Sequence, residues 1–216
     1  MNYTHTFDIR VESGVLRRVS DFKYLGSWLL NCNKDFEVRR ALAWNACTRL
    51  GKIWKSRSIS RDVKLNLFRA CVESVLLYNA VTWTMTSTLE KRLDGCYTRL
   101  LRYALDIKWD TYTSNDKLYG KLPRVSSRLL EKQLIFAGHC VRSDQPVSDL
   151  VFWDHTKMAR CKCAPGAGSR GNNAKLLLKK AGKVDGLVVS DQELTKLMKD
   201  RDEWRLRVRT IVLENK

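Results

Sequence analysis

The clearest structural signal in the chain lies in residues 87–104, which read STLEKRLDGCYTRLLRYA. A Ser-x-x-Glu capping box opens this stretch at Ser87 and Glu90, and such a box is typical of a helix N-terminus. Behind it, apolar residues recur at helical spacing, at Leu89, Leu93, Cys96, Leu100, Leu101 and Ala104. The stretch therefore predicts an amphipathic helix that buries one face.

Comparable stripes lie on both sides of this helix. One earlier stripe consists of Val38, Leu42, Ala46, Leu50, Ile53 and Trp54. The next has Ser60 as its cap and consists of Val63, Leu67, Cys71, Val75 and Leu76. After Pro123, a fourth helix is expected to start at Ser126 and to carry Leu130, Leu134 and Ala137. The connections are short, so we expect the helices to pack as one bundle.

The two ends of the chain have other patterns. Residues 7–11 and 22–28 alternate apolar and polar side chains, and a Ser-Gly turn signal at 13–14 predicts a small antiparallel unit around it. Residues 143–172 have loop composition, with a short helix expected at 150–153 and a basic linker at 164–173. A second capping box, at 190–193, predicts a C-terminal helix with an apolar face of Leu194, Leu197, Met198, Trp204, Val208, Ile211 and Val212.

The predicted fold is therefore mainly α with a small N-terminal antiparallel β unit, in the α+β class. We expect three parts: a β-hairpin in 1–33, a helical bundle in 34–142 and a loop-rich basic extension ending in a helix in 143–216. No apolar run approaches the roughly 20 residues that span a bilayer. The first residues do not resemble a secretory signal. We therefore expect no membrane partner.

Charge is the strongest compositional signal in these 216 residues. Forty Lys and Arg against 23 Asp and Glu give a formal net charge of +17, and such a surface attracts polyanions, most commonly nucleic acid. Seven cysteines, an odd number, are mostly scattered through apolar helical patterns. Buried reduced thiols in an intracellular protein fit this pattern better than a disulfide framework does.

The cations concentrate in two places. Residues 49–69 contain seven against one acid, Asp62, namely Arg49, Lys52, Lys55, Arg57, Arg61, Lys64 and Arg69. Ile53 and Trp54 lie among them and offer an apolar or stacking surface beside phosphate-binding cations. A second stripe, opposite the leucine face of residues 89–104, consists of Lys91, Arg92, Arg99 and Arg102. The alternative is that both are solvated helix faces and that Trp54 belongs to the core.

The sequence offers little for metal binding or catalysis. Cys161 and Cys163 follow His155, and His139 adjoins Cys140, but Cys-x-Cys is tighter than the usual zinc spacing, so we expect no required zinc site. No nucleophile elbow, P-loop or dinucleotide fingerprint is present. The one close acidic set, within 200–203, alternates with arginines and indicates intrahelical ion pairs. We therefore predict no catalytic residue and no cofactor.

Six segments follow one another along the chain, in 19–27, from Lys52 to Leu65, in 76–83, in 101–115, in 138–142 and in 200–205. In this order they resemble segments of LINE-type (non-LTR) retrotransposon reverse transcriptases. The corresponding family patterns are F-x-YLG for 19–27, LLYG-x-E-T-W for 76–83, LR…W…TN for 101–115, GH-x-x-R for 138–142 and DR-x-x-WR for 200–205. The chain departs from the family pattern at Asn79, where Gly is usual, at Val81, where Glu is usual, and in 131–133 and 168–172.

The resemblance implies roles for these segments. Phe22, Tyr24, Leu25 and Gly26 resemble the primer grip. The following helices resemble the thumb, which holds the template–primer duplex. Gly138, His139 and Arg142 resemble part of a nucleic-acid-binding C-terminal extension. The family's catalytic aspartates would precede Met1, so we expect a truncated frame, with an upstream palm domain as a partner in the parent polyprotein.

The resulting expectation is a non-catalytic fragment, intracellular and nuclear, that binds RNA or DNA. Two alternatives stay open: an enzyme in trans that completes a separate palm, and a folded retroelement remnant or interaction module with no independent function. Oligomeric state is left open. If five of the seven cations in 49–69 reach phosphates, a plot of log K for binding against log salt concentration has a slope of about −4.5 on duplex DNA and about −3.5 on single strands. Alanine at Lys52, Lys55, Arg57 and Arg61 is expected to flatten this slope while the fold survives.

Overall fold

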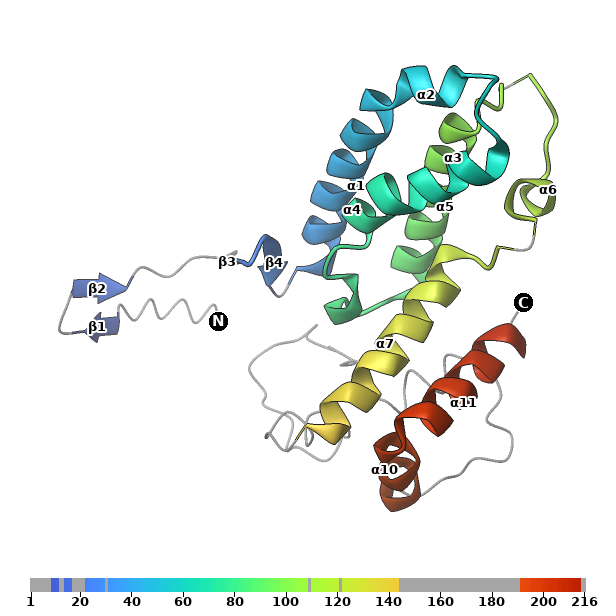
Figure 1. Cartoon of the computed structure of the whole chain (residues 1–216). Coiled ribbons are helices and arrows are strands. Elements are labelled where there is room, and N and C mark those ends of the chain that lie inside the picture. The colour runs from blue at the N-terminus through green and yellow to red at the C-terminus, as the bar shows by residue number, and fades with distance from the viewer. Residues whose placement is uncertain are drawn as a thin grey trace.

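Helices form most of the described chain, and two short β-hairpins precede them (Figure 1). The computed structural model describes residues 9–11, 14–16, 22–29, 31–108, 110–120, 122–143 and 191–214. The prediction of a mainly α fold with a small antiparallel β unit is confirmed. The short helix expected at 150–153 and the basic linker at 164–173 lie outside the described residues.

The β structure consists of two hairpins. Strand β1 (Ile9–Val11) pairs antiparallel with β2 (Gly14–Leu16), with Val11 opposite Gly14, and β3 (Phe22–Tyr24) pairs with β4 (Ser27–Leu29). Ser13 of the expected turn lies outside the described residues. The second hairpin turns at Leu25 and Gly26, whose φ angles are 47° and 84°. A two-residue turn with positive φ at both positions matches the right-handed twist of the strands, and a leucine is uncommon there.

The helical elements follow in sequence order. They are α1 (Cys32–Arg49), α2 (Gly51–Lys55), α3 (Arg61–Phe68), the π turn η1 (Arg69–Glu73), α4 (Ser74–Leu76), the 3₁₀ turn η2 (Ala80–Thr82), α5 (Ser87–Ala104), α6 (Asn115–Tyr119), α7 (Val125–Arg142), α10 (Asp191–Lys199) and α11 (Arg201–Glu214). The expected C-terminal helix is thus two helices. They are separated at Asp200, which accepts the backbone N–H groups of Asp202 and Glu203 and so caps α11. Within 191–214, the predicted ion pairs of 200–203 do not form.

Side-chain caps fix several helix starts. Ser60 accepts the N–H of Val63 at the start of α3, as predicted. The cap of α5 is Thr86, which accepts the N–H of Leu89, so the predicted cap at Ser87 is wrong by one residue. Helix α7 starts at Val125, and the expected cap Ser126 instead donates its hydroxyl to Asp94 over 2.8 Å.

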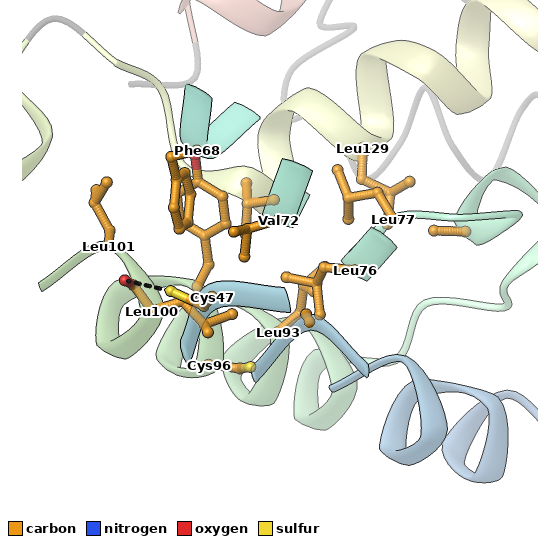
Figure 2. Packing of buried hydrophobic residues seen from close by; sticks show 14 of the residues in the cluster. Cys47, Phe68, Val72, Leu76, Leu77, Leu93, Cys96, Leu100, Leu101 and Leu129 are labelled. Carbon is orange, nitrogen blue, oxygen red and sulfur yellow. Dashed lines mark hydrogen bonds between the residues drawn. The ribbon is translucent and has the colours of Figure 1, made fainter. Parts of the chain in front are cut away.

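The main hydrophobic core lies between α1, α5 and the segment from α3 to α4 (Figure 2). The whole predicted face of α5 is buried, from Leu89 to Ala104. The predicted faces of the two preceding helices are only partly correct. Trp54 and Leu76 are buried, but Leu42 is 44% exposed and Val63 is 54% exposed. The core also contains buried side chains of this part of the chain that neither stripe includes, namely Phe36, Ala43, Cys47, Phe68 and Val72.

A second, smaller core forms between α7, α10 and α11. It consists of Leu134, Ala137, Cys140, Val141, Leu194, Met198, Trp204, Val208 and Val212. The expected apolar face of the C-terminal segment is confirmed for Leu194, Met198, Trp204, Val208 and Val212, which are buried, and Leu197 is half-buried. Figure 1 shows α10 and α11 lying along α7.

Candidate nucleic-acid interface

Helices α1 and α5 lie side by side in the same direction, and this pairing brings the later part of the α5 basic stripe near the start of the stretch 49–69. Arg92, near the start of α5, donates to Asn33, near the start of α1, over 3.0 Å. Further along, Sγ of Cys47 lies 3.9 Å from the carbonyl oxygen of Leu100. The C-terminal end of α1, where the first basic stretch begins, therefore lies beside the C-terminal half of α5.

An aromatic pair marks the surface of this seam. The rings of Trp44 and Tyr103 meet edge to face, with centroids 6.0 Å apart, and Tyr103 is 39% exposed. A Cβ at Gly51 would lie 3.3 Å from Oη of Tyr103, so α2 starts directly beside the phenol. Lys52 follows Gly51, and Arg99 lies one helical turn before Tyr103. The seam thus places an exposed aromatic ring next to helix segments that carry exposed cations, the combination that stacks bases and holds phosphates.

Trp54, the aromatic residue that the sequence singled out for stacking, has a structural role. Its side chain is 1% exposed, and its indole N–H donates to the carbonyl of Cys47 over 2.8 Å. The alternative interpretation, a core tryptophan, is therefore confirmed. The functional candidates Trp44 and Tyr103 were missed because neither lies on a predicted apolar stripe. Only the pairing of α1 with α5 brings them together.

Four of the eleven candidate cations are used inside the molecule. Arg61 donates to the carbonyl of Leu118 over 2.7 Å, and Lys64 donates to the carbonyl of Trp54 over 2.6 Å. Arg92 pairs with Glu37, and Arg102 donates to the carbonyl of Thr113 over 2.7 Å. These side chains hold elements of the fold together, which corrects the expectation that Arg61 could be removed without affecting the fold.

The side chains of the other seven candidate cations are exposed and make no hydrogen bond or ion pair with any residue that the structure describes. They are Arg49, Lys52, Lys55, Arg57, Arg69, Lys91 and Arg99. Five of them belong to the stretch 49–69, which is the number that the sequence-based salt slope assumed. Exposed cations without internal partners keep their charge available to a polyanion.

The β3–β4 hairpin is attached to the bundle by polar contacts to its turn. Arg39 donates to the carbonyl of Gly26, and the hydroxyl of Tyr78 donates to the carbonyl of Leu25 over 2.9 Å. The Arg39 guanidinium also lies over the Tyr78 ring, 4.2 Å from its centroid. Phe22, Tyr24 and Leu25 are all exposed. Their primer-grip role stays a prediction.

The GH-x-x-R segment lies on α7, where it faces the C-terminal helices. A Cβ at Gly138 would overlap the indole of Trp204, and that indole donates to the carbonyl of Leu134 over 2.9 Å. Arg142 donates to the carbonyl of Met198 over 2.6 Å. The structure thus uses Gly138 and Arg142 for packing α10 and α11, while His139 is exposed.

The described residues provide no group of three His, Cys, Asp or Glu side chains that could hold a metal ion. His155, Cys161 and Cys163 lie outside the described part, so the zinc expectation stays a prediction. Cys47, Cys96 and Cys140 are buried and free, whereas Cys32 and Cys71 are half-buried. Loss of hydration raises the pKa of the Cys47 and Cys96 thiols to about 11, which makes them unreactive.

Comparisons of the chain with family models, with curated proteins and with solved structures gave no match. Among the described residues, no helix combines the length and the apolar character that a membrane-spanning helix needs.

Proposed function

We propose that this chain is a non-catalytic nucleic-acid-binding module that holds the phosphate backbone of RNA or DNA on the surface formed by α1, α2, the α2–α3 loop and α5. The observation that carries the proposal is the division of the candidate cations. The side chains of the seven exposed ones have no internal partner among the described residues, and all of them except Arg69 lie on these elements. The α1–α5 pairing brings the part of α5 that carries Arg99 near the end of α1, where α2 begins.

The resemblance to reverse transcriptases supports the same proposal. It implies that the helices act as a thumb, with template–primer duplex as ligand, a palm domain as partner and the nucleus as location. Phosphate contacts carry no base information, so the cations of this surface give affinity with little sequence preference. The exposed part of the Tyr103 ring adds a contact that a single strand can use.

The test is the salt dependence of binding, with a triple variant that keeps the structural cations. Lys52→Ala, Lys55→Ala and Arg57→Ala remove three charges that have no internal partner among the described residues. We expect the slope of log K against log salt concentration to be about −4.5 for the parent protein on duplex DNA. The slope of the triple variant is expected to be less negative by about 2.7. An RNA–DNA hybrid is expected to behave like the duplex.

A matched control removes the same charge elsewhere. Lys132→Ala, Lys196→Ala and Lys199→Ala change exposed side chains of α7 and α10. This control is expected to keep the parent slope. If it flattens the slope and the first triple variant does not, the interface lies on the C-terminal helices. A parent slope near zero would remove the nucleic-acid proposal and favour the remnant or interaction module.

A further inference from the structure

A surface hollow lies between α3 and the segment that follows α6. Its volume is about 430 Å³, which is within the range of small-molecule sites. Arg61, Asp62, Asn66 and Arg69 line it from the α3 side, and Tyr119 and Leu122 line it from the other. Asp62, Asn66 and Arg69 are three to four positions apart, so they lie on one face of the helical segment that runs from α3 into η1.

Two walls of the hollow are held in place by internal contacts. The Arg61 guanidinium donates to the Leu118 carbonyl over 2.7 Å. The Tyr119 hydroxyl lies 2.8 Å from Oγ1 of Thr98, and its ring stacks on Tyr97 with centroids 6.2 Å apart and an interplanar angle of 23°. Fixed planar groups of this kind suit a planar ligand, because little side-chain entropy is lost on binding.

The polar groups at the mouth of the hollow are available to a ligand. The side chains of Asp62, Asn66 and Arg69 are exposed and form no hydrogen bond or ion pair with any residue in the described ranges. A carboxylate accepts hydrogen bonds, a guanidinium donates them and an amide does both. The hollow therefore presents an acceptor beside donors, next to fixed planar side chains.

This combination matches an unpaired base with an exocyclic amine. Unstacked bases bind to arginine planes and aromatic rings, with hydrogen bonds to the exposed base edge. Cytosine offers an N4 amine that can donate to Asp62, whereas thymine and uracil have a carbonyl oxygen at that position, which a carboxylate repels. Arg69 and Asn66 can donate to the remaining acceptors of the cytosine edge. A bare phosphate fits less well, because Asp62 would repel it.

We propose that this hollow binds one unpaired base of a single-stranded nucleic acid, with cytosine preferred over thymine or uracil. The inference rests on the proposed function, since the phosphates of the same strand would lie on the basic surface. The positions agree with this: Arg57 lies in the loop that leads into α3, four residues before Arg61. The surface would thus hold the backbone, and the hollow would read one base.

The experiment compares deoxycytidine and thymidine oligonucleotides of equal length by fluorescence anisotropy. We expect the parent protein to bind the deoxycytidine strand about fivefold or more tightly, with the same salt slope for both strands. Asp62→Asn is expected to abolish the preference. Asp106→Asn, which changes the charge equally outside the hollow, is expected to keep it.

The outcomes separate this inference from the proposed function. Equal, salt-dependent binding of both strands by the parent overturns the hollow as a base site and leaves the backbone interface standing. A cytosine preference that survives Asp62→Asn in a folded variant also overturns it. Absence of binding to any strand overturns the proposed function itself. The parent comparison needs no variant, so a misfolded Asp62→Asn protein does not prevent the test.

Discussion

The indole N–H of Trp83 donates a 2.8 Å hydrogen bond to Oδ2 of Asp35, and both side chains are buried. The other carboxylate oxygen, Oδ1, accepts the backbone N–H of Trp28 over 3.2 Å. Asp35 lies on α1, Trp83 follows η2 and Trp28 lies on β4. One carboxylate therefore joins the hairpin, the first helix and the segment that precedes α5.

Asp35→Asn is expected to lower the free energy of unfolding by about 2–3 kcal/mol. The amide keeps one acceptor, but its NH₂ group then faces an N–H donor, which leaves buried donors unpaired. Urea unfolding followed by tryptophan fluorescence measures the loss. Asp110→Asn, at an exposed carboxylate, is the control and should change stability by less than about 0.5 kcal/mol. A similar result for both variants would contradict the role of Asp35.

A buried ion pair links the π turn to α7. Both carboxylate oxygens of Glu73 accept from Nη1 of Arg128 over 2.9 Å, and Oε2 also accepts the Tyr97 hydroxyl over 3.0 Å. Glu73→Gln is expected to cost about 3 kcal/mol, because a buried guanidinium then lacks its counter-charge. In Glu73→Gln with Arg128→Met, the loss should be clearly smaller than the sum of the single losses. Additive losses in urea unfolding would show that the pair contributes no coupling.

Gly138→Ala is expected to destabilise the packing of α10 and α11 on α7. The new Cβ would overlap the Trp204 indole, and overpacking of this kind costs about 1–3 kcal/mol. Hydrogen exchange should show faster exchange in 191–214 with α5 still protected. The matched control is Gly95→Ala, where an added Cβ meets nothing within 4 Å, so the helix should gain about 0.5–1 kcal/mol. Equal exchange in both variants would contradict the close Gly138–Trp204 contact.

Alkaline pH is expected to destabilise the main core through Cys47 and Cys96. Burial raises the pKa of both thiols from 9.0 to about 11. Above pH 9 the unfolded thiols ionise while the folded ones keep their protons, so stability falls as the pH rises toward 11. The loss is on the order of 2 kcal/mol per thiol.

Urea unfolding under reducing conditions at several pH values checks this effect. Cys47→Ala with Cys96→Ala should start from a lower stability but show a shallower decline with pH. The comparison separates the thiols from tyrosines and lysines that titrate in the same range. An equally steep decline in the double variant would place the alkaline sensitivity elsewhere.

The sequence predicts the fold best where the buried face of a helix is purely apolar. That condition holds for α5, and its face was predicted correctly. Helix α1 also buries Asp35 and Arg39, which contact β4 and the hairpin turn, so the hydrophobic pattern selected the wrong side, where Leu42 is exposed. In the next segment, the π turn at 69–73 departs from the 3.6-residue period. A prediction that assumes a constant helical period through 63–76 therefore assigns some of these residues to the wrong face.

The candidate site is less predictable, because it depends on contacts between distant residues. Arg57 and Arg61 are indistinguishable in sequence, yet the partner that fixes Arg61 is a carbonyl 57 residues away. Trp44 and Tyr103 likewise meet only through the packing of two helices. The sequence predicts which cations are present, and the fold determines which of them remain free.

Helix α7 is continuous through both hydrophobic cores. Val125 and Leu129 belong to the main core, whereas Leu134, Ala137 and later residues belong to the second. Each residue turns a helix by about 100°, so one residue inserted between Leu129 and Leu134 would rotate the second core's face by about that angle relative to the first. An insertion close to whole turns, such as about seven residues for two turns, would be needed to restore the alignment. The number of residues in this segment therefore acts as a phase constraint, and length changes here should be among the least tolerated in the chain.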